Sequence, residues 1–291
     1  MAAGNTTTTA ITELIPEITL QIQSIYQDKS VAQALVTNID RNGQPGLTVE
    51  VPRWTAVAGS TTVVETAIPT SHAMDITMPT LTMARRAVYV ILGDVAKKAA
   101  ATGNIALAIG AEMGLAQAKQ DDTSIFNILT ATTNWGTGTG SVTGALATSF
   151  ILDALLFLEL NEIDDPLYGV LHPKQYNNIR DELTPVISTT ISGVPQAGEM
   201  LRSAFVTEML GATWFKTNRI SSGTVTSTAD VYNGLLFAAR GIGYAHSWLE
   251  ANGVEIERSA TDAQSRMIIN YVDSAAVIYN SAVCKLYSTS A

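Results

Sequence analysis

Residues 47–94 decide the fold, and they read LTVEVPRWTAVAGSTTVVETAIPTSHAMDITMPTLTMARRAVYVILGD. Near the start, Leu47, Val49 and Val51 alternate with polar residues, and Pro52-Arg53-Trp54 then interrupts the run. Alternation with a period of two is typical of a strand with one apolar face. The beginning of this stretch therefore predicts a strand that is broken at a proline.

A second alternating run returns after a polar tip. The tip is Ala58-Gly59-Ser60-Thr61-Thr62, and the returning run sets Met74, Ile76 and Met78 against polar neighbours. Together the two runs predict a long two-stranded ribbon. Because an isolated hairpin is at best marginally stable in water, its apolar face requires another surface. The most economical surface is a second copy of the same chain, which indicates a subunit of an assembly.

The composition agrees with an assembly. The 291-residue chain is 46% hydrophobic and only 15% charged, whereas soluble domains are typically about 25% charged. Burial of much of the surface between subunits explains these values, and a single unusually apolar core is the alternative. The net charge of −9 argues against a general nucleic-acid binder, which needs a basic patch. An acidic wall would nevertheless enclose a polyanion without adhering to it, and ordinary solubility explains the charge equally well.

The cysteine content and the length of the apolar runs indicate in which compartment the protein is made. Cys284 is the only cysteine, so neither an intrachain disulfide nor a multi-cysteine metal site is possible, and we expect a small buried hydrophobe there. The first basic residue is Lys29, so the N-terminus lacks the charged start of a secretory signal. No uncharged apolar run reaches the ~18 residues of a transmembrane helix. We expect a soluble protein made in a cytoplasm.

The segments around the ribbon have helical and strand patterns of their own. Isoleucines from Ile11 to Ile25 recur at helical spacing and predict an amphipathic arm to about Val36, before a turn at residues 38–43. After the ribbon, residues 87–92 predict an apolar strand.

A long helical pattern then runs over residues 94–129, with candidate N-caps at Asp94 and Asn104. Gly110 and Gly114 weaken this helix locally, but their small size would allow close approach of a neighbour. The Gly/Thr-rich residues 130–143 predict a linker.

An α/β pattern follows the linker. We expect helices at residues 150–160, 174–180 and 197–210, the last closing at Gly211, and a loop at residues 184–195. The strands expected in this part and in the C-terminal part are residues 167–171, 213–217, 232–237, 254–258, 266–272 and 276–286.

No residue pattern points to an enzyme. His72, His172 and His246 lie in different segments and outside any metal-binding or hydrolase motif. The pairs Asp121-Asp122 and Asp164-Asp165 are explained by a solvated helix face and a loop turn, since adjacent helical residues point apart. Glycines near residue 140 lack the spacing of a phosphate-binding loop. We expect a chain without catalytic function, metal or cofactor.

The charged residues of the ribbon and its base predict subunit contacts. Arginine suits interfaces because its planar guanidinium binds a carboxylate in two places. A solvated surface is the alternative for each residue singly. The candidate interface residues are Arg53, Trp54, Glu65, Asp75, Arg85 and Arg86.

The order of these elements resembles the major capsid proteins of tailed bacteriophages, which have the Hong Kong 97-type fold. The matching stretches span nearly the whole chain, and the resemblance depends on their order. They are ELIPEITLQIQSIYQDKSVAQALV from residue 13, MDITMPTLTMARRAVYVILGDVAKK from 74, GVLHPKQYNNIRDEL from 169, AFVTEMLGATWFKTNRI from 204 and GLLFAARGIGYAHSWLEANGVEIERSATDAQSRMIINYVDSAAVIY from 234.

The resemblance implies an α+β fold with four parts. Residues 1–46 would form the N-terminal arm, and residues 47–83 the extended β-ribbon known as the E-loop. Residues 84–144 and 241–291 would form a peripheral domain with a long spine helix. Residues 145–240 would form an axial α/β domain around the capsomer axis.

The resemblance also implies a structural function. Hexamers and pentamers would tile an icosahedral shell around the double-stranded DNA genome, without sequence-specific DNA binding and without a membrane. The chain would be made in the host bacterial cytoplasm and end in the virion. Separate scaffolding, portal and cement proteins are the expected partners. Residues 47–83 contain no lysine, so the lysine–asparagine cross-link of some family members is not expected, and the loop at 184–195 is a candidate for axis contacts.

Three alternatives remain open from the sequence. An encapsulin-type nanocompartment shell protein shares this fold and encloses a cargo enzyme. A multimeric enzyme would need a convergent polar site after residue 145, and a phage tail or decoration protein would not need the long helix and the returning C-terminal strands.

Overall fold

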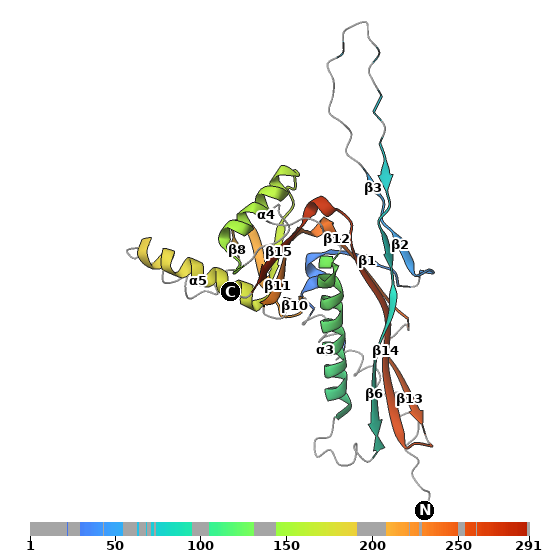
Figure 1. Ribbon diagram of the computed structural model, residues 1–291. Helices are drawn as coiled ribbons and strands as arrows, with labels where there is room; N and C mark the ends of the chain where they lie inside the picture. The colour runs from blue at the N-terminus through green and yellow to red at the C-terminus, as the bar shows by residue number, and fades with distance from the viewer. Residues whose placement is uncertain are drawn as a thin grey trace, which may run out of the picture.

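Two β-sheets form the body of the protein, and a long ribbon projects from the first of them (Figure 1). The structure is a computed structural model. It describes residues 22, 30–42, 44–54, 63, 68, 71–72, 74–94, 105–130, 144–190, 208–220, 222–226, 229–249, 254–259 and 261–289.

The first sheet is built around one long strand, β14 (Gln264–Val277). On one side β14 pairs with β6 (Ala84–Gly93), and on the other with β12 (Ile242–Trp248) and β13 (Val254–Ser259), all antiparallel. At the far edge β1 (Thr37–Asp40) pairs with β12 in parallel. Residues from both ends of the chain therefore share this sheet.

Helix α3 (Ile105–Phe126) covers one face of the first sheet and continues into η2 (Asn127–Thr130). Met113 packs with Val90 and Ile269 in the apolar layer between helix and sheet. A Cβ atom on Gly114 would lie 2.7 Å from the carbonyl oxygen of Ile22. The small residue thus allows the backbone at Ile22 to approach the helix, as the sequence predicts.

The second sheet has the order β10-β11-β7-β9-β8, and β15 pairs with β11. Helices α4 (Thr148–Leu160) and α5 (Pro173–Thr190) pack on one face, while η1 (Ala32–Leu35) and the end of α3 contribute to the other. The strands are β7 (Leu167–Leu171), β8 (Glu208–Met209), β9 (Ala212–Lys216), β10 (Ser222–Thr226), β11 (Ala229–Ala238) and β15 (Val283–Thr289).

The ribbon consists of two short paired segments in line. Near the body, β2 (Thr48–Glu50) pairs with β5 (Thr80–Thr82), and farther out β3 (Arg53–Trp54) pairs with β4 (Ile76–Thr77). The predicted break at residue 52 thus separates two segments of one ribbon. This confirms the predicted two-stranded ribbon over the residues that the structure describes.

Several other predictions are confirmed. The predicted strand 167–171 is β7, the predicted helix 150–160 lies in α4, and the predicted strand 87–92 lies in β6. Cys284 is fully buried, as predicted, and burial raises its pKa to about 12.

Near the N-terminus, the turn predicted at residues 38–43 is wrong over residues 38–40. These residues lie in β1, because Thr37 to Asp40 pair with Gly243 to His246 some 200 residues later. The arm helix predicted to reach Val36 ends differently, since η1 is a 3-10 helix. Apart from the helical and buried Ile22, the predicted arm before residue 30 lies outside the described residues, as do the linker at 131–143 and the candidate N-cap Asn104. The other candidate N-cap, Asp94, is described, and its carboxylate accepts hydrogen bonds from both Nη atoms of Arg258 (2.8 and 2.7 Å).

Three predictions in the C-terminal half are also wrong in part. The loop expected from residue 184 is helical to Thr190, and its remainder lies outside the described residues. Residues 208–209, expected in a helix, form β8, and the positive φ angles of Leu210 (55°) and Gly211 (77°) close a two-residue hairpin turn into β9. The strand expected over 276–286 is interrupted by η4 (Asn280–Ala282).

The last strand joins the second sheet. The resemblance implies that residues 241–291 belong with residues 84–144, and within that range β15 pairs with β11 along seven residues. The short helix η3 (Ala239–Gly241) and η4 lie where the chain passes from one sheet to the other.

Candidate assembly surface

The outer part of the ribbon exposes a group of large apolar side chains. Trp54 and Ile76 are a cross-strand pair and are 56% and 43% exposed. Met74 and Met78 lie two residues on either side of Ile76, the spacing that repeats one face of an extended chain, and are 52% and 54% exposed. We call these four residues the ribbon stripe. Among the residues that the structure describes, none covers it.

The inner part of the ribbon is covered by the chain itself. Val49 and Leu81 form the corresponding pair at the base, and they are 7% and 0% exposed. They pack with Ala245 and Val272 of the first sheet. The ribbon is therefore anchored at its base and presents apolar surface farther out. Met83, directly after the ribbon base, is buried as well, whereas Met74 and Met78 farther out are exposed.

Arg53 connects the ribbon to the second half of the molecule. Its guanidinium carbon lies 4.9 Å from the ring centroid of Tyr279, and that of Arg240 lies 6.0 Å from the same ring. Arg240 also forms an ion pair with Asp165, with Nε 2.6 Å from Oδ2. Cation–π contacts of this kind are favourable by about 0.5–1 kcal/mol at exposed sites. Arg53 thereby helps to orient the outer ribbon relative to the body.

A cavity of about 740 Å³ lies beside this contact at the base of the ribbon. Its walls come from three parts of the chain: the ribbon, the end of α3 with η2, and the end of β14 with the start of η4. The residues from the ribbon are Arg53, Thr77, Met78 and Pro79. Because Met78 also belongs to the ribbon stripe, the cavity and the stripe form one continuous surface.

Arg85 and Arg86 have partners within the chain. The Nε atom of Arg86 lies 2.9 Å from Oδ1 of Asp273, whose side chain is fully buried. Nη2 of Arg85 donates to Oδ1 of Asn270 at 2.9 Å. Both arginines stand on β6, away from the outer ribbon where Arg53, Trp54 and the exposed Asp75 lie. Glu65 lies outside the described residues. The predicted interface residues therefore do not form one cluster in a single chain.

The acidic pair in α3 is buried, so its interpretation as a solvated helix face was wrong. Asp121 and Asp122 are 0% and 1% exposed. As expected for adjacent helical residues, the two side chains point towards different parts of the structure. Each acid is four residues from a buried apolar residue, Ile125 for Asp121 and Phe126 for Asp122. That spacing is the sequence signal that would have placed both acids on covered faces.

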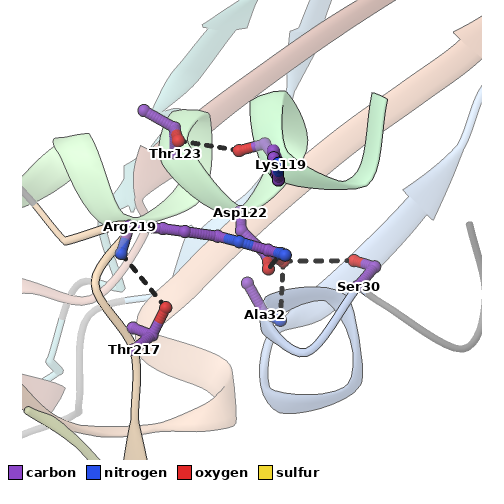
Figure 2. A network of polar contacts seen from close by, with 7 residues as sticks. All are labelled: Ser30, Ala32, Lys119, Asp122, Thr123, Thr217 and Arg219. Atoms are coloured by element: carbon purple, nitrogen blue, oxygen red, sulfur yellow. Dashed lines mark hydrogen bonds and ion pairs between the residues drawn. The ribbon is translucent and has the colours of Figure 1, made fainter. Parts of the chain in front are cut away.

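Asp122 joins three parts of the chain, as Figure 2 shows. Its Oδ1 accepts hydrogen bonds from the Ser30 hydroxyl (3.2 Å) and the Ala32 backbone N–H (3.0 Å). Its Oδ2 accepts a charge-assisted hydrogen bond from Arg219, which follows β9. Hydrogen bonds and ion pairs to a charged group are stronger than those between neutral groups. Asp122 therefore holds the N-terminal segment, α3 and the second sheet in one arrangement.

His246 and Tyr271 lie on the face of the first sheet that α3 covers. The strand register places His246 between Asp40 and Asp273. Burial lowers the pKa of His246 to about 4, although the two carboxylates partly oppose this shift. Burial, together with Asp121 and Asp273, raises the pKa of Tyr271. Both side chains are therefore neutral at pH 7 and act as packing groups, with ring centroids 5.6 Å apart.

Comparison with known proteins was made by sequence and by structure. No protein-family model matches the chain, and no curated protein matches it in sequence. Solved structures match over most of their length. A chain of Mycobacterium phage Che8 superposes with a TM-score of 0.66 at 18% identity, covering 88% of this chain and 90% of that chain.

Two further structures show the breadth of the similarity. The capsid structure of cyanophage P-SCSP1u matches with a TM-score of 0.64 at 15% identity, covering 90% of this chain and 89% of that chain. A virus-like particle from Pyrococcus furiosus matches with a TM-score of 0.58 at 10% identity, covering 93% and 98%. Similarity at this level of identity concerns the fold. The chain therefore has the fold of the major capsid proteins of tailed bacteriophages, with helices and sheets in one mixed architecture.

Proposed function

We propose that this chain is a major capsid protein, whose copies assemble as hexamers and pentamers into an icosahedral shell around the double-stranded DNA of a tailed phage. The observation that carries the proposal is the ribbon stripe, a projecting apolar surface that none of the described residues covers, because such a surface points to a partner. The similarity in fold to phage capsid structures supports a second copy as that partner.

In this proposal residues 47–83 are the E-loop and lie across a neighbouring copy. A ribbon that buries on the order of 1,000 Å² would contribute about 25 kcal/mol gross at ~25 cal/mol/Å². Most of this is offset by the entropy of docking and of ordering side chains. Single contacts are therefore weak, and the closed shell multiplies them.

In the proposal the first sheet belongs to the peripheral domain and the second sheet to the axial domain, except that the last strand, β15, lies in the second sheet. Residues 84–144 and 241–291 form the peripheral domain with α3 as its spine helix, and residues 145–240 form the axial domain. The pairing of β15 with β11 supports a close association of the last strand with the axial part. Asp122 would then fix the axial part to the spine helix through Arg219.

The residue types present in the ribbon limit which interactions could hold such a shell together. Because residues 47–83 contain no lysine, burial, hydrogen bonds and ion pairs, or separate cement proteins, would replace a covalent cross-link. Scaffolding and portal proteins are proposed as further partners, and the virion as the final location. No helix among the described residues is long and apolar enough to cross a membrane. The similarity to capsid structures supports a structural rather than an enzymatic role.

A nanocompartment of the encapsulin type is the second candidate. The match to a virus-like particle from Pyrococcus furiosus, at a TM-score of 0.58 over 98% of that chain, supports a closed particle without separating the two candidates. Both candidates are closed shells, and they differ in their contents. Nuclease-protected DNA inside particles from infected cells would support the phage capsid, whereas a protein cargo would support the nanocompartment.

Negative-stain electron microscopy of the purified chain tests the shell itself. The chain is expressed alone and then with a candidate scaffolding protein. We expect closed polyhedral or spherical particles, or hexameric and pentameric rings. A small monodisperse oligomer under both conditions would contradict the proposal.

A further inference from the structure

Helix α4 has an apolar face that none of the described residues covers. Leu152, Leu156 and Leu160 follow one another at intervals of four residues and are 50%, 52% and 74% exposed. We call these three residues the leucine stripe. The opposite face of the helix, with Ile151, Ala154, Leu155 and Leu158, is buried against the second sheet. A helix that is apolar all round normally has both faces covered, so the leucine stripe indicates a missing neighbour.

The charges around the leucine stripe have one sign. The exposed charged residues of the helix are Asp153 and Glu159, and Glu162 and Asp164 follow directly. Residues 148–164 contain no basic residue. A complementary surface should therefore combine an apolar contact with positive charge.

Such a surface exists at another place on the second sheet. The register pairs Lys216 at the end of β9 with Leu171 at the end of β7, which brings Lys216 to the junction where α5 begins. The Lys216 ammonium lies 5.4 Å from the ring centroid of the half-buried Tyr176, and Lys174 is exposed on the same helix. We call Lys174, Tyr176 and Lys216 the basic patch. It combines a cation–π pair, Lys216 over Tyr176, with a further exposed lysine in the first turn of α5.

The two surfaces lie on different strands of the second sheet. Helix α4 packs mainly against β15, whereas Lys216 lies on β9, and β11 and β7 separate these strands. A contact between the leucine stripe of one copy and the basic patch of another is therefore heterologous. Heterologous contacts repeat around an axis and close a ring when the rotation permits it.

We infer that the leucine stripe of α4 packs against the basic patch of the next copy around a ring. The inference rests on the proposed function, and it names the contact that joins neighbours within a capsomer. Three exposed leucines form a patch of roughly a few hundred Å² at most. A stable dimer interface buries about 800 Å² per partner. The contact thus holds only together with other contacts in a closed ring, which favours a second copy over an isolated partner protein.

Disulfide cross-linking tests the inference directly. Leu156→Cys is combined with Asn177→Cys, an exposed position on α5 one turn after Lys174, and the native Cys284 is buried. After oxidation of assembled particles, we expect the double variant to give a ladder of covalent multimers up to five or six subunits. Each single variant should remain monomeric on the same non-reducing gel.

The outcomes separate this inference from the proposed function. Intact particles that give no ladder would overturn the α4–α5 contact and leave the shell in place. Covalent dimers from Leu156→Cys alone would also overturn it, because α4 would then meet α4. Absence of any particle or ring from the wild-type chain would overturn the proposed function and the inference with it.

Substitution provides an independent readout. We expect Leu152→Ser with Leu156→Ser to lower the yield of rings at least tenfold without a change in the unfolding temperature. Leu249→Ser, at a leucine 48% exposed outside α4, is the matched control and should assemble normally. Glu159→Lys should weaken ring formation, and adding Lys174→Glu should restore it. Wild-type yields from the double serine variant would contradict the inference.

Discussion

The two parts of the ribbon have the same alternating pattern and different surroundings. At the base, the Val49–Leu81 pair is buried by the first sheet. Farther out, the Trp54–Ile76 pair is equally apolar and stands exposed. Because strand pairing and composition are alike, the difference lies in which surface covers the pair. The chain covers the base itself, whereas none of the described residues covers the outer part, and in the proposed function a second copy covers it.

The largest effect is expected from removing the outer ribbon. Deletion of residues 56–72 should leave a folded monomer or capsomer that cannot close shells, because the base of the ribbon keeps its own anchor. Electron microscopy and light scattering measure assembly, and circular dichroism measures folding. Normal particles from the deletion variant would show that the outer ribbon is not an assembly surface.

The matched pair Leu81→Ala and Ile76→Ala separates the two parts of the ribbon. Leu81→Ala should lower the free energy of unfolding by about 2–5 kcal/mol, since a fully buried leucine loses its contacts and leaves a cavity. Ile76→Ala should change it by less than about 0.5 kcal/mol, as exposed positions do, while lowering the yield of shells. Urea denaturation of the unassembled chain provides both free energies. Equal losses of stability would contradict the distinction between base and outer ribbon.

Arg86 lies close to the base, and its substitution should affect folding as well as assembly. The sequence predicts that Arg86→Glu disrupts assembly more than folding. Arg86→Glu should also lower the free energy of unfolding, because it removes the cation that pairs with the buried carboxylate of Asp273. We expect a loss of about 1–3 kcal/mol, at the lower end because Arg86 is 41% exposed. Thermal unfolding of the unassembled chain measures it.

Arg86→Lys is the control for that variant, since it retains the charge and loses the planar geometry of the guanidinium. It should recover part of the stability. If Arg86→Glu has the wild-type unfolding temperature but does not assemble, Arg86 acts only in contacts between subunits.

The local sequence pattern was sufficient to predict an element where a segment is apolar and is bounded by residues that end a strand. The strand at residues 167–171 lies between Pro166 and His172-Pro173, and β7 has the predicted bounds. The ribbon was likewise predictable from its alternation. The burial of the ribbon base could not be predicted in this way, because the residues that cover it, Val272 and Ala245, come from distant strands.

Distant partners also account for the failures. Residues 37–40 have the composition of a turn but form β1, because the edge of β12 is available about 200 residues later. The same holds for charges. Asp122 and Asp273 are acids whose cations, Arg219 and Arg86, are supplied by separate elements. Helical spacing could have indicated that Asp122 is buried, whereas its partner required the fold.

The smallest effect concerns pH and the sheet that anchors the ribbon base. His246 faces Asp40, Asp273 and Tyr271, and its pKa is about 4 in the folded chain against 6.5 for the free side chain. The unfolded chain therefore binds more protons between these values, so stability is full above pH 6.5 and falls as the pH decreases towards 4.

Between pH 7 and pH 6 the expected loss from His246 is less than about 1 kcal/mol. His246→Gln removes the titrating group, so its free energy of unfolding should change less over this interval than that of the wild type. Urea denaturation at both pH values measures the difference. The same pH dependence in both proteins would mean that His246 does not couple protonation to the folding of the sheet. Among the described residues, the ring neighbours of His246 are Tyr244, Trp248 and Tyr271 of the first sheet and not the ribbon stripe. Ile76→Ala should therefore keep the wild-type pH dependence, which separates the anchored base from the exposed surface.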